Sequence, residues 1–158
     1  MSISIVLIGI GNEYRRDDGV GLFALRELRN KGFPPTRYIE SNEDGTDLLE
    51  TWTNAEMVIL IDAISSGAVA GTIYRFDART QPLPATFSSQ STHAFGVAET
   101  IELARVLHQL PSRLIVYAIE GKHFTVGLGL SPEVEQAMHE VVERVTDEVR
   151  KSLISDKQ

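Results

Sequence analysis

The chain has 158 residues, a formal net charge of -7 and no cysteine. This length suits one domain with a sizeable core, and we expect residues 1–158 to form a single domain. The acidic balance argues against a nucleic-acid partner, and the lack of cysteine excludes disulfides, thiolate metal sites and a cysteine nucleophile. No apolar run reaches the roughly 20 residues that span a bilayer, and the first residues have the pattern of a strand rather than a signal peptide. We therefore expect a cytoplasmic protein with no membrane partner.

Apolar runs typical of buried strands alternate with amphipathic segments typical of helices. The pattern predicts strands at Ser4–Ile10, Arg37–Glu40, Met57–Asp62 and Leu114–Ile119, with a more exposed, antiparallel edge strand in Gly71–Asp77. It predicts helices at Asp18–Lys31, Thr46–Trp52, Ala94–His108 and from Pro132 onward. Strands that alternate with helices indicate an α/β fold, here a three-layer α/β/α sandwich around a mostly parallel five-stranded sheet.

The first apolar strand runs into a glycine-rich loop that carries two adjacent acids. Its sequence is Gly9-Ile10-Gly11-Asn12-Glu13-Tyr14-Arg15-Arg16-Asp17-Asp18-Gly19-Val20-Gly21. Open α/β sheets bind their ligands at the carboxyl ends of the strands, which is where this loop lies. Asp17 is a candidate N-cap, because the start of a helix favours acids. Asp18 is then the carboxylate available as a metal ligand or as an acid or base.

A dinucleotide-binding loop is the main alternative for this stretch. Such a loop requires Gly-x-Gly-x-x-Gly, but Tyr14 occupies the third glycine position and the next glycine is Gly19. The acids also stand where a pyrophosphate would bind, and they would repel it. Glu40, at the end of the second predicted strand, does match the acid that binds a ribose. A nucleotide- or small-ligand-binding α/β module therefore stays open as an alternative.

Two further residues have the character of a polar site. Asp62 follows five apolar residues, at the same sheet edge as Asp18, and His93 precedes the third predicted helix. Two carboxylates and one imidazole suit a borderline divalent ion such as nickel or zinc, with positions left for substrate. Their spacing is not that of a compact metal motif. Each residue also has an ordinary structural alternative: a first-turn acid, a turn cap and a hydrated histidine at a helix end.

The stretch from Gly9 to Gly21 resembles the opening motif of the hydrogenase maturation proteases. That motif is Gly-x-Gly-Asn, four variable residues, Asp, then Asp or Glu, Gly, an aliphatic residue and Gly, and every fixed position is present here. The resemblance covers nearly the whole chain and implies a phosphorylase/hydrolase-like sandwich. It also implies that Asp18, Asp62 and His93 are the metal-contacting and catalytic residues. Some members have Glu at the position of Asp18, so the shorter side chain changes the reach to the metal.

The resemblance implies an endopeptidase that removes a C-terminal extension from the nickel-loaded precursor of a nickel–iron hydrogenase large subunit. The nickel belongs to that precursor, so no tightly bound intrinsic cofactor is expected. Either the ion, or Asp18 or Asp62 as a general base, would activate the attacking group.

Two other places are candidates for contact with the substrate. Asp44-Gly45-Thr46 resembles a second family motif, linked to recognition of the large subunit, although a glycine that members commonly carry between the Asp and the Gly is missing here. The alternative for this segment is a turn before the second predicted helix. His123, in the loop after the last predicted strand, is a candidate substrate contact, and a surface position is its more ordinary alternative.

Overall fold

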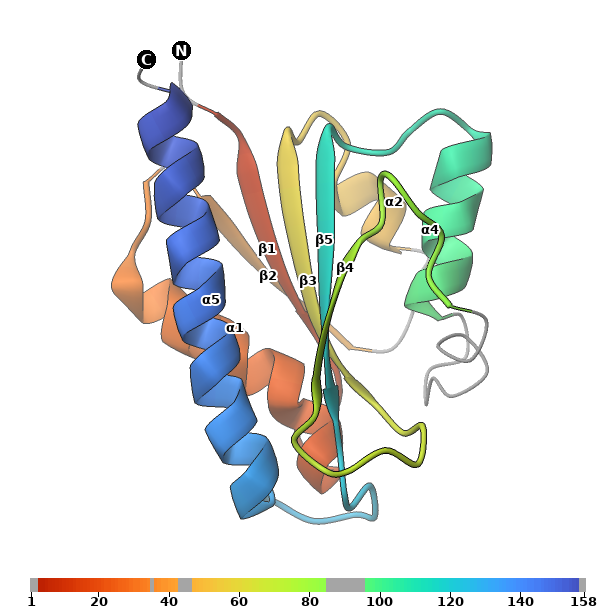
Figure 1. The fold of residues 1–158 in the computed structure, drawn as a ribbon, viewed down its shortest axis with the longest axis vertical. Helices are drawn as coiled ribbons and strands as arrows, with labels where there is room; N and C mark the ends of the chain where they lie inside the picture. The colour runs from red at the N-terminus through yellow and green to blue at the C-terminus, as the bar shows by residue number, and fades with distance from the viewer. Residues whose placement is uncertain (1–2, 35, 43–46, 85–95, 157–158) are drawn as a thin grey trace.

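The structure is a computed structural model that describes residues 3–34, 36–42, 47–84 and 96–156 (Figure 1). A five-stranded sheet forms the middle layer, with the strand order β2-β1-β3-β5-β4. Four strands are parallel: β1 (Ile5–Ile10), β2 (Thr36–Ser41), β3 (Met57–Ile64) and β5 (Arg113–Glu120). The fifth, β4 (Ile73–Asp77), pairs antiparallel with β5 at one edge of the sheet. The predicted mostly parallel sheet with its antiparallel edge strand is confirmed.

Helices cover both faces of the sheet (Figure 1). On one face lie α1 (Val20–Lys31) and α5 (Pro132–Asp156); on the other lie α2 (Leu48–Thr51) and α4 (Val97–Val106). A short 3-10 helix, η1 (Arg16–Gly19), precedes α1. This is the predicted three-layer arrangement. Among the described residues, no helix combines the length and the apolarity needed to cross a membrane.

The central strand β3 shows how the sheet separates two halves of the core. All eight of its residues are buried, so its sequence is continuously apolar rather than alternating. Its side chains nevertheless divide between the two faces: Met57, Ile59, Ile61 and Ala63 pack with α1 and α5, and Val58, Leu60 and Ile64 pack with α2 and α4. By this alternation, Asp62 belongs to the face of α2 and α4.

Element ends differ from the predicted ones by a few residues. β3 continues past Asp62 to Ile64, because β5 supplies ladder partners for both added residues. The helix predicted from Asp18 divides into η1 and α1. α4 ends at Val106, before the predicted end at His108, since His108 has a φ of 56° that takes the backbone out of the helix.

Candidate functional site

The first loop is built on close backbone contacts that only glycine permits. A Cβ on Gly9 would lie 2.3 Å from the carbonyl oxygen of Gly21, and a Cβ on Gly21 would lie 2.2 Å from that of Ile61. The helix α1 therefore begins directly over the junction of β1 and β3. Gly11 has a φ of +150°, and a Cβ there would lie 2.0 Å from the carbonyl oxygen of Asp18. These contacts explain the glycine spacing and bring Asp18 to the carboxyl-end edge of the sheet.

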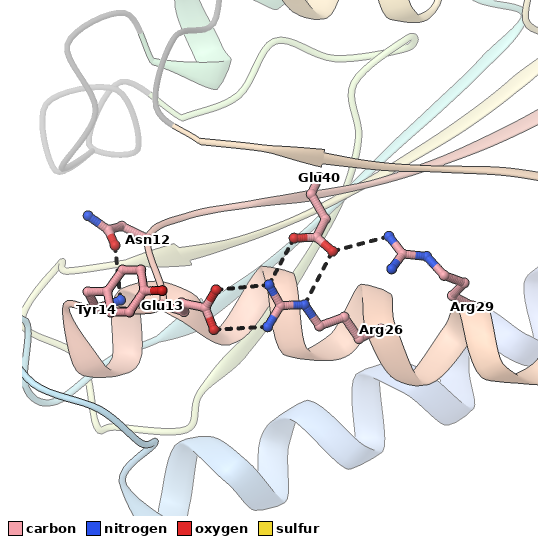
Figure 2. Close-up of polar contacts among 6 residues, drawn as sticks. All are labelled: Asn12, Glu13, Tyr14, Arg26, Arg29 and Glu40. Atoms are coloured by element: carbon pink, nitrogen blue, oxygen red, sulfur yellow. Dashed lines mark hydrogen bonds and ion pairs between the residues drawn. The ribbon is translucent and has the colours of Figure 1, made fainter.

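Asp18 is oriented by the loop that precedes it. It is only 2% exposed, and its Oδ2 accepts a hydrogen bond of 3.0 Å from the backbone N–H of Asn12. Asn12 in turn accepts, through its side-chain oxygen, a bond of 2.9 Å from the backbone N–H of Tyr14 (Figure 2). This local turn is a usual role of asparagine. The asparagine of the motif thus shapes the loop that holds Asp18, a role that sequence reasoning missed.

Asp62 lies near the carboxyl end of the neighbouring strand, two residues before β3 ends at Ile64. It is 2% exposed, and its Oδ1 accepts a hydrogen bond of 2.8 Å from the backbone N–H of Ala63. It follows Ile61, which pairs with Gly9 in the last step of the β1–β3 ladder, and η1 packs against β3. Asp18 and Asp62 therefore lie at the same edge of the sheet, while their role in catalysis or metal contact stays a prediction.

The other predicted site residues, His93 and the segment Asp44-Gly45-Thr46, lie outside the described residues. His93 shortly precedes α4, whose buried side chains pack on the face to which Asp62 belongs. Within residues 3–34, 36–42, 47–84 and 96–156, no three His, Cys, Asp or Glu side chains form a group that would hold a metal ion. That range does not contain His93, so the three-residue set stays a prediction.

Asp17 is not the helix cap that the sequence predicts. It is fully buried, and the cap position of η1 is Arg15. Its carboxylate accepts four hydrogen bonds from the β5–α5 loop (residues 121–131): 2.8 Å from the N–H of Lys122, 2.9 Å from the N–H of His123, 2.7 Å from the N–H of Ser131 and 2.8 Å from the Ser131 hydroxyl. Burial alone would raise the pKa of Asp17, but these bonds outweigh it and lower that pKa.

Backbone hydrogen bonds join the β5–α5 loop to the first loop along its length. Gly127 donates to the carbonyl of Tyr14 at 2.9 Å, and Arg16 donates back to the carbonyl of Gly127 at 3.1 Å. Asp17 donates to the carbonyl of His123 at 3.0 Å. His123 itself is exposed and, with Arg16, lines a cavity of about 220 Å³ at this junction. The two loops therefore form one wall beside Asp18.

Glu40 is occupied by arginines of α1, as Figure 2 shows. Arg26 donates to both of its oxygens, at 2.9 and 3.2 Å, and Arg29 donates to one of them at 3.2 Å. Arg26 also makes two bonds, of 3.0 and 3.1 Å, to Glu13. The hydrogen bonds from Arg26, and then the one from Arg29, lower the pKa of Glu40. A carboxylate already bound by two guanidinium groups does not suit the ribose-binding acid that the nucleotide alternative requires.

Comparison with known proteins identifies the family of this chain. The profile of the family described as hydrogenase maturation protease matches residues 27–148 of this chain. The chain belongs to the hydrogenase maturation protease family. Hydrogenase 2 maturation protease of Escherichia coli (strain K12) is 28% identical to it over 153 residues, which cover 94% of this chain and 92% of that protein.

Solved structures share the fold of this hydrogenase maturation protease. The hydrogenase maturating endopeptidase HybD from Escherichia coli superposes with a TM-score of 0.83 over 95% of this chain and 94% of that chain, at 24% identity. The NiFe hydrogenase maturation protease HybD from Thermococcus kodakarensis gives a TM-score of 0.73 at 25% identity, over 93% of this chain and 99% of that one. The chain is therefore a peptidase with the α/β fold of its family, and the nucleotide-binding alternative is not supported.

Proposed function

We propose that this hydrogenase maturation protease removes a C-terminal extension from the nickel-loaded precursor of a nickel–iron hydrogenase large subunit. The observation that carries the proposal is the pair of buried carboxylates, Asp18 in η1 and Asp62 near the end of β3, at the same edge of the sheet. Backbone N–H groups hold one oxygen of each. Oriented carboxylates of this kind bind divalent ions or activate water.

His93 would complete a set of two carboxylates and one imidazole. Its inclusion is supported by the direction of α4, whose first residues lie toward the carboxyl ends of the parallel strands (Figure 1). The nickel is part of the substrate, and the enzyme needs no tightly bound cofactor of its own. Contact between the nickel and Asp18, Asp62 and His93 would bring the adjoining peptide bond to this edge of the sheet.

Two routes to hydrolysis suit these groups. In the first, the ion, or a water bound to it, polarises or attacks the scissile carbonyl. In the second, Asp18 or Asp62 takes a proton from a water that attacks the carbonyl. In both routes the peptide C–N bond breaks, and the leaving nitrogen takes up a proton.

Recognition of the correct precursor is assigned to Asp44-Gly45-Thr46. This segment shortly follows β2, whose last residue, Ser41, pairs with Ile10 at the end of β1. A segment that follows β2 is thus attached at the same edge as the carboxylates, where the substrate would bind. We place the reaction in the cytoplasm, in agreement with a chain that has no cysteine.

Incubation with nickel-loaded precursors of candidate large subunits, read by intact mass, tests this function. One precursor should lose a C-terminal peptide. Asp62→Asn should slow that loss at least about 100-fold, because it retains an acceptor for Ala63 but removes the charge. Asp18→Glu should largely retain activity, whereas Asp18→Ala and His93→Ala should lose it. Unchanged mass for every precursor, together with micromolar binding of NAD or ATP, would favour the nucleotide alternative instead.

A further inference from the structure

The wall beside Asp18 carries large apolar side chains on its outer surface. Tyr14 in the first loop is 64% exposed, and Val126 and Leu128 in the β5–α5 loop are 78% and 70% exposed. We name these three residues the apolar rim. They are neighbours in space because Gly127, between the two aliphatic residues, donates its backbone N–H to the carbonyl of Tyr14 at 2.9 Å.

The apolar rim is held in place by strong internal contacts. Asp17 anchors both ends of the β5–α5 loop through the N–H groups of Lys122, His123 and Ser131. The Arg15 side chain also donates to the carbonyl of Phe124, at 3.3 Å. A loop with this many bonds presents its apolar side chains in a defined arrangement, so binding there need not order the loop first.

Positive groups surround the apolar rim, although the chain as a whole carries a net charge of -7. Arg15, Arg16 and Lys122 are all exposed on the same two loops. Lys122 has a partner, Glu133, at 3.2 Å. Within the described part of the chain, the side chain of Arg16 has no hydrogen bond or ion pair. Of the carboxylates in the first loop, Asp17 and Asp18 are buried, and Glu13 is bound by Arg26 of α1 at 3.0 and 3.1 Å.

We propose that the apolar rim is a docking surface for the hydrogenase large-subunit precursor and that it fits an apolar patch bordered by acidic groups. The inference rests on the proposed function, because it assigns the partner of the same site. The rim lies on the loop that carries Asp18 and on the β5–α5 loop bonded to it. A protein seated on the rim would therefore have its cleavable end at the carboxylates. Apolar side chains at the centre of such a contact supply affinity, and the surrounding charges supply orientation and rate of association.

Steady-state cleavage of the nickel-loaded precursor by Val126→Ser, Leu128→Ser and the double variant tests the inference. Each single change should raise KM several-fold and the double change about 10-fold or more, with kcat and Tm close to wild type. Val106→Ser is the matched control, since Val106 is 74% exposed on α4, away from the rim. Arg16→Gln should raise KM to a smaller extent and weaken the dependence of KM on salt.

A binding assay separates failure of the docking surface from failure of the proposed function. The Asp62→Asn protein should bind the precursor, and the double rim change placed on it should weaken that binding by about the same factor as it raises KM. Cleavage by wild type with an unchanged KM in the double variant would overturn the docking surface alone. Absence of both binding and cleavage in wild type would overturn both proposals. A wild-type dimer that the double variant dissolves would assign the rim to self-association and would also overturn the inference.

Discussion

Two carboxylates, the buried Asp17 and the half-buried Glu148, tie α5 to the rest of the protein in different ways. Asp17 of η1 binds the loop that leads into α5. It accepts hydrogen bonds from three backbone N–H groups and one hydroxyl of that loop, all neutral donors. Glu148, in the second half of α5, binds the Arg75 guanidinium of β4 at 2.6 and 3.2 Å and accepts from the hydroxyl of Tyr117 of β5. The first carboxylate shapes a loop, and the second joins a helix to two strands.

This difference indicates which of the two contacts the candidate site depends on. Neutral backbone donors that lose a buried acceptor are left without a partner, which is costly. Arg75, by contrast, is 41% exposed and can return to water if Glu148 is removed. Asp17 also directly precedes Asp18, whereas Glu148 lies in the second half of α5, which begins at Pro132 next to the loop wall. We therefore expect loss of Asp17 to damage both stability and cleavage, and loss of Glu148 to damage stability alone.

Removal of the Asp17 carboxylate should have the largest effect. Asp17→Ala should lower the free energy of unfolding by about 3–5 kcal/mol, because four donors lose a charged acceptor. For a chain of this size, that corresponds to a fall in Tm of roughly 6–20 °C. Cleavage measured well below the new Tm should still fall more than about 10-fold, because the wall beside Asp18 is released.

Asp147→Ala is the control for this change, since Asp147 is an exposed acid of α5. Its Tm and its cleavage rate should equal those of wild type. A folded Asp17→Ala protein with wild-type kcat and KM would show that the loop wall does not serve the site, and the contrast with Glu148 would disappear.

Loss of the Glu148 carboxylate should have a smaller effect. Glu148→Ala should lower the free energy of unfolding by about 1–3 kcal/mol, since the buried hydroxyl of Tyr117 loses its acceptor and Arg75 loses an ion pair. Thermal unfolding should show this, while kcat and KM at a temperature where both proteins are folded stay at wild-type values. Exposed Glu143→Ala provides the matched control. A large change in kcat would indicate that the contact of Glu148 with Arg75 and Tyr117 is coupled to the site.

The pH dependence of stability should distinguish the contribution of the negative charge of Glu148 from that of its size and hydrogen bonding. Burial alone would raise the pKa of Glu148, but the hydrogen bonds from Arg75 and Tyr117 outweigh it and lower that pKa below its ordinary value of 4.5. A lowered pKa means that the stabilisation is fully present above about pH 5.5 and is lost as the pH falls through the folded-state value. The free energy of unfolding of wild type should therefore exceed that of Glu148→Gln by about 1 kcal/mol near neutral pH, and this difference should disappear in acid. A difference in unfolding free energy that grows in acid would show that the pKa of Glu148 is raised rather than lowered.

The exposed network in Figure 2 should contribute least. Arg26 joins Glu13 and Glu40, but all three side chains are about one-third exposed, so water and salt compete with the pairs. Arg26→Gln should change Tm by no more than about 2 °C, and the change should shrink further in 0.5–1 M salt, roughly where screening is strongest. A fall in Tm as large as that of Asp17→Ala would show that exposed and buried carboxylate contacts contribute equally to the stability of this protein.

Much of the fold can be predicted from the sequence, because it depends on the local pattern of apolar and polar residues. Continuous apolar runs predict the buried strands β1, β3 and β5, and their alternation with helices predicts a parallel sheet. The mixed polarity of residues 71–77 predicts the edge strand β4. The glycines at Gly9, Gly11 and Gly21 mark a loop where backbone approaches backbone, a constraint that acts on residue type directly. The common edge of Asp18 and Asp62 follows from the same parallel order.

Contacts between distant segments could not be predicted from the sequence. Nearly every residue has a backbone N–H, so the residue type does not show which N–H groups will donate to a given side chain. The donors to Asp17 lie 105 to 114 positions away, so a buried anchor had the local pattern of a helix cap. Glu40 likewise resembles a ribose-binding acid until α1 places Arg26 and Arg29 against it. In the same way, Tyr14, Val126 and Leu128 are unremarkable in sequence and become one surface only because the tertiary fold pairs their loops. Side-chain chemistry and periodicity determine which elements form, whereas packing across the sheet edge determines which polar groups serve structure and which are left for the substrate.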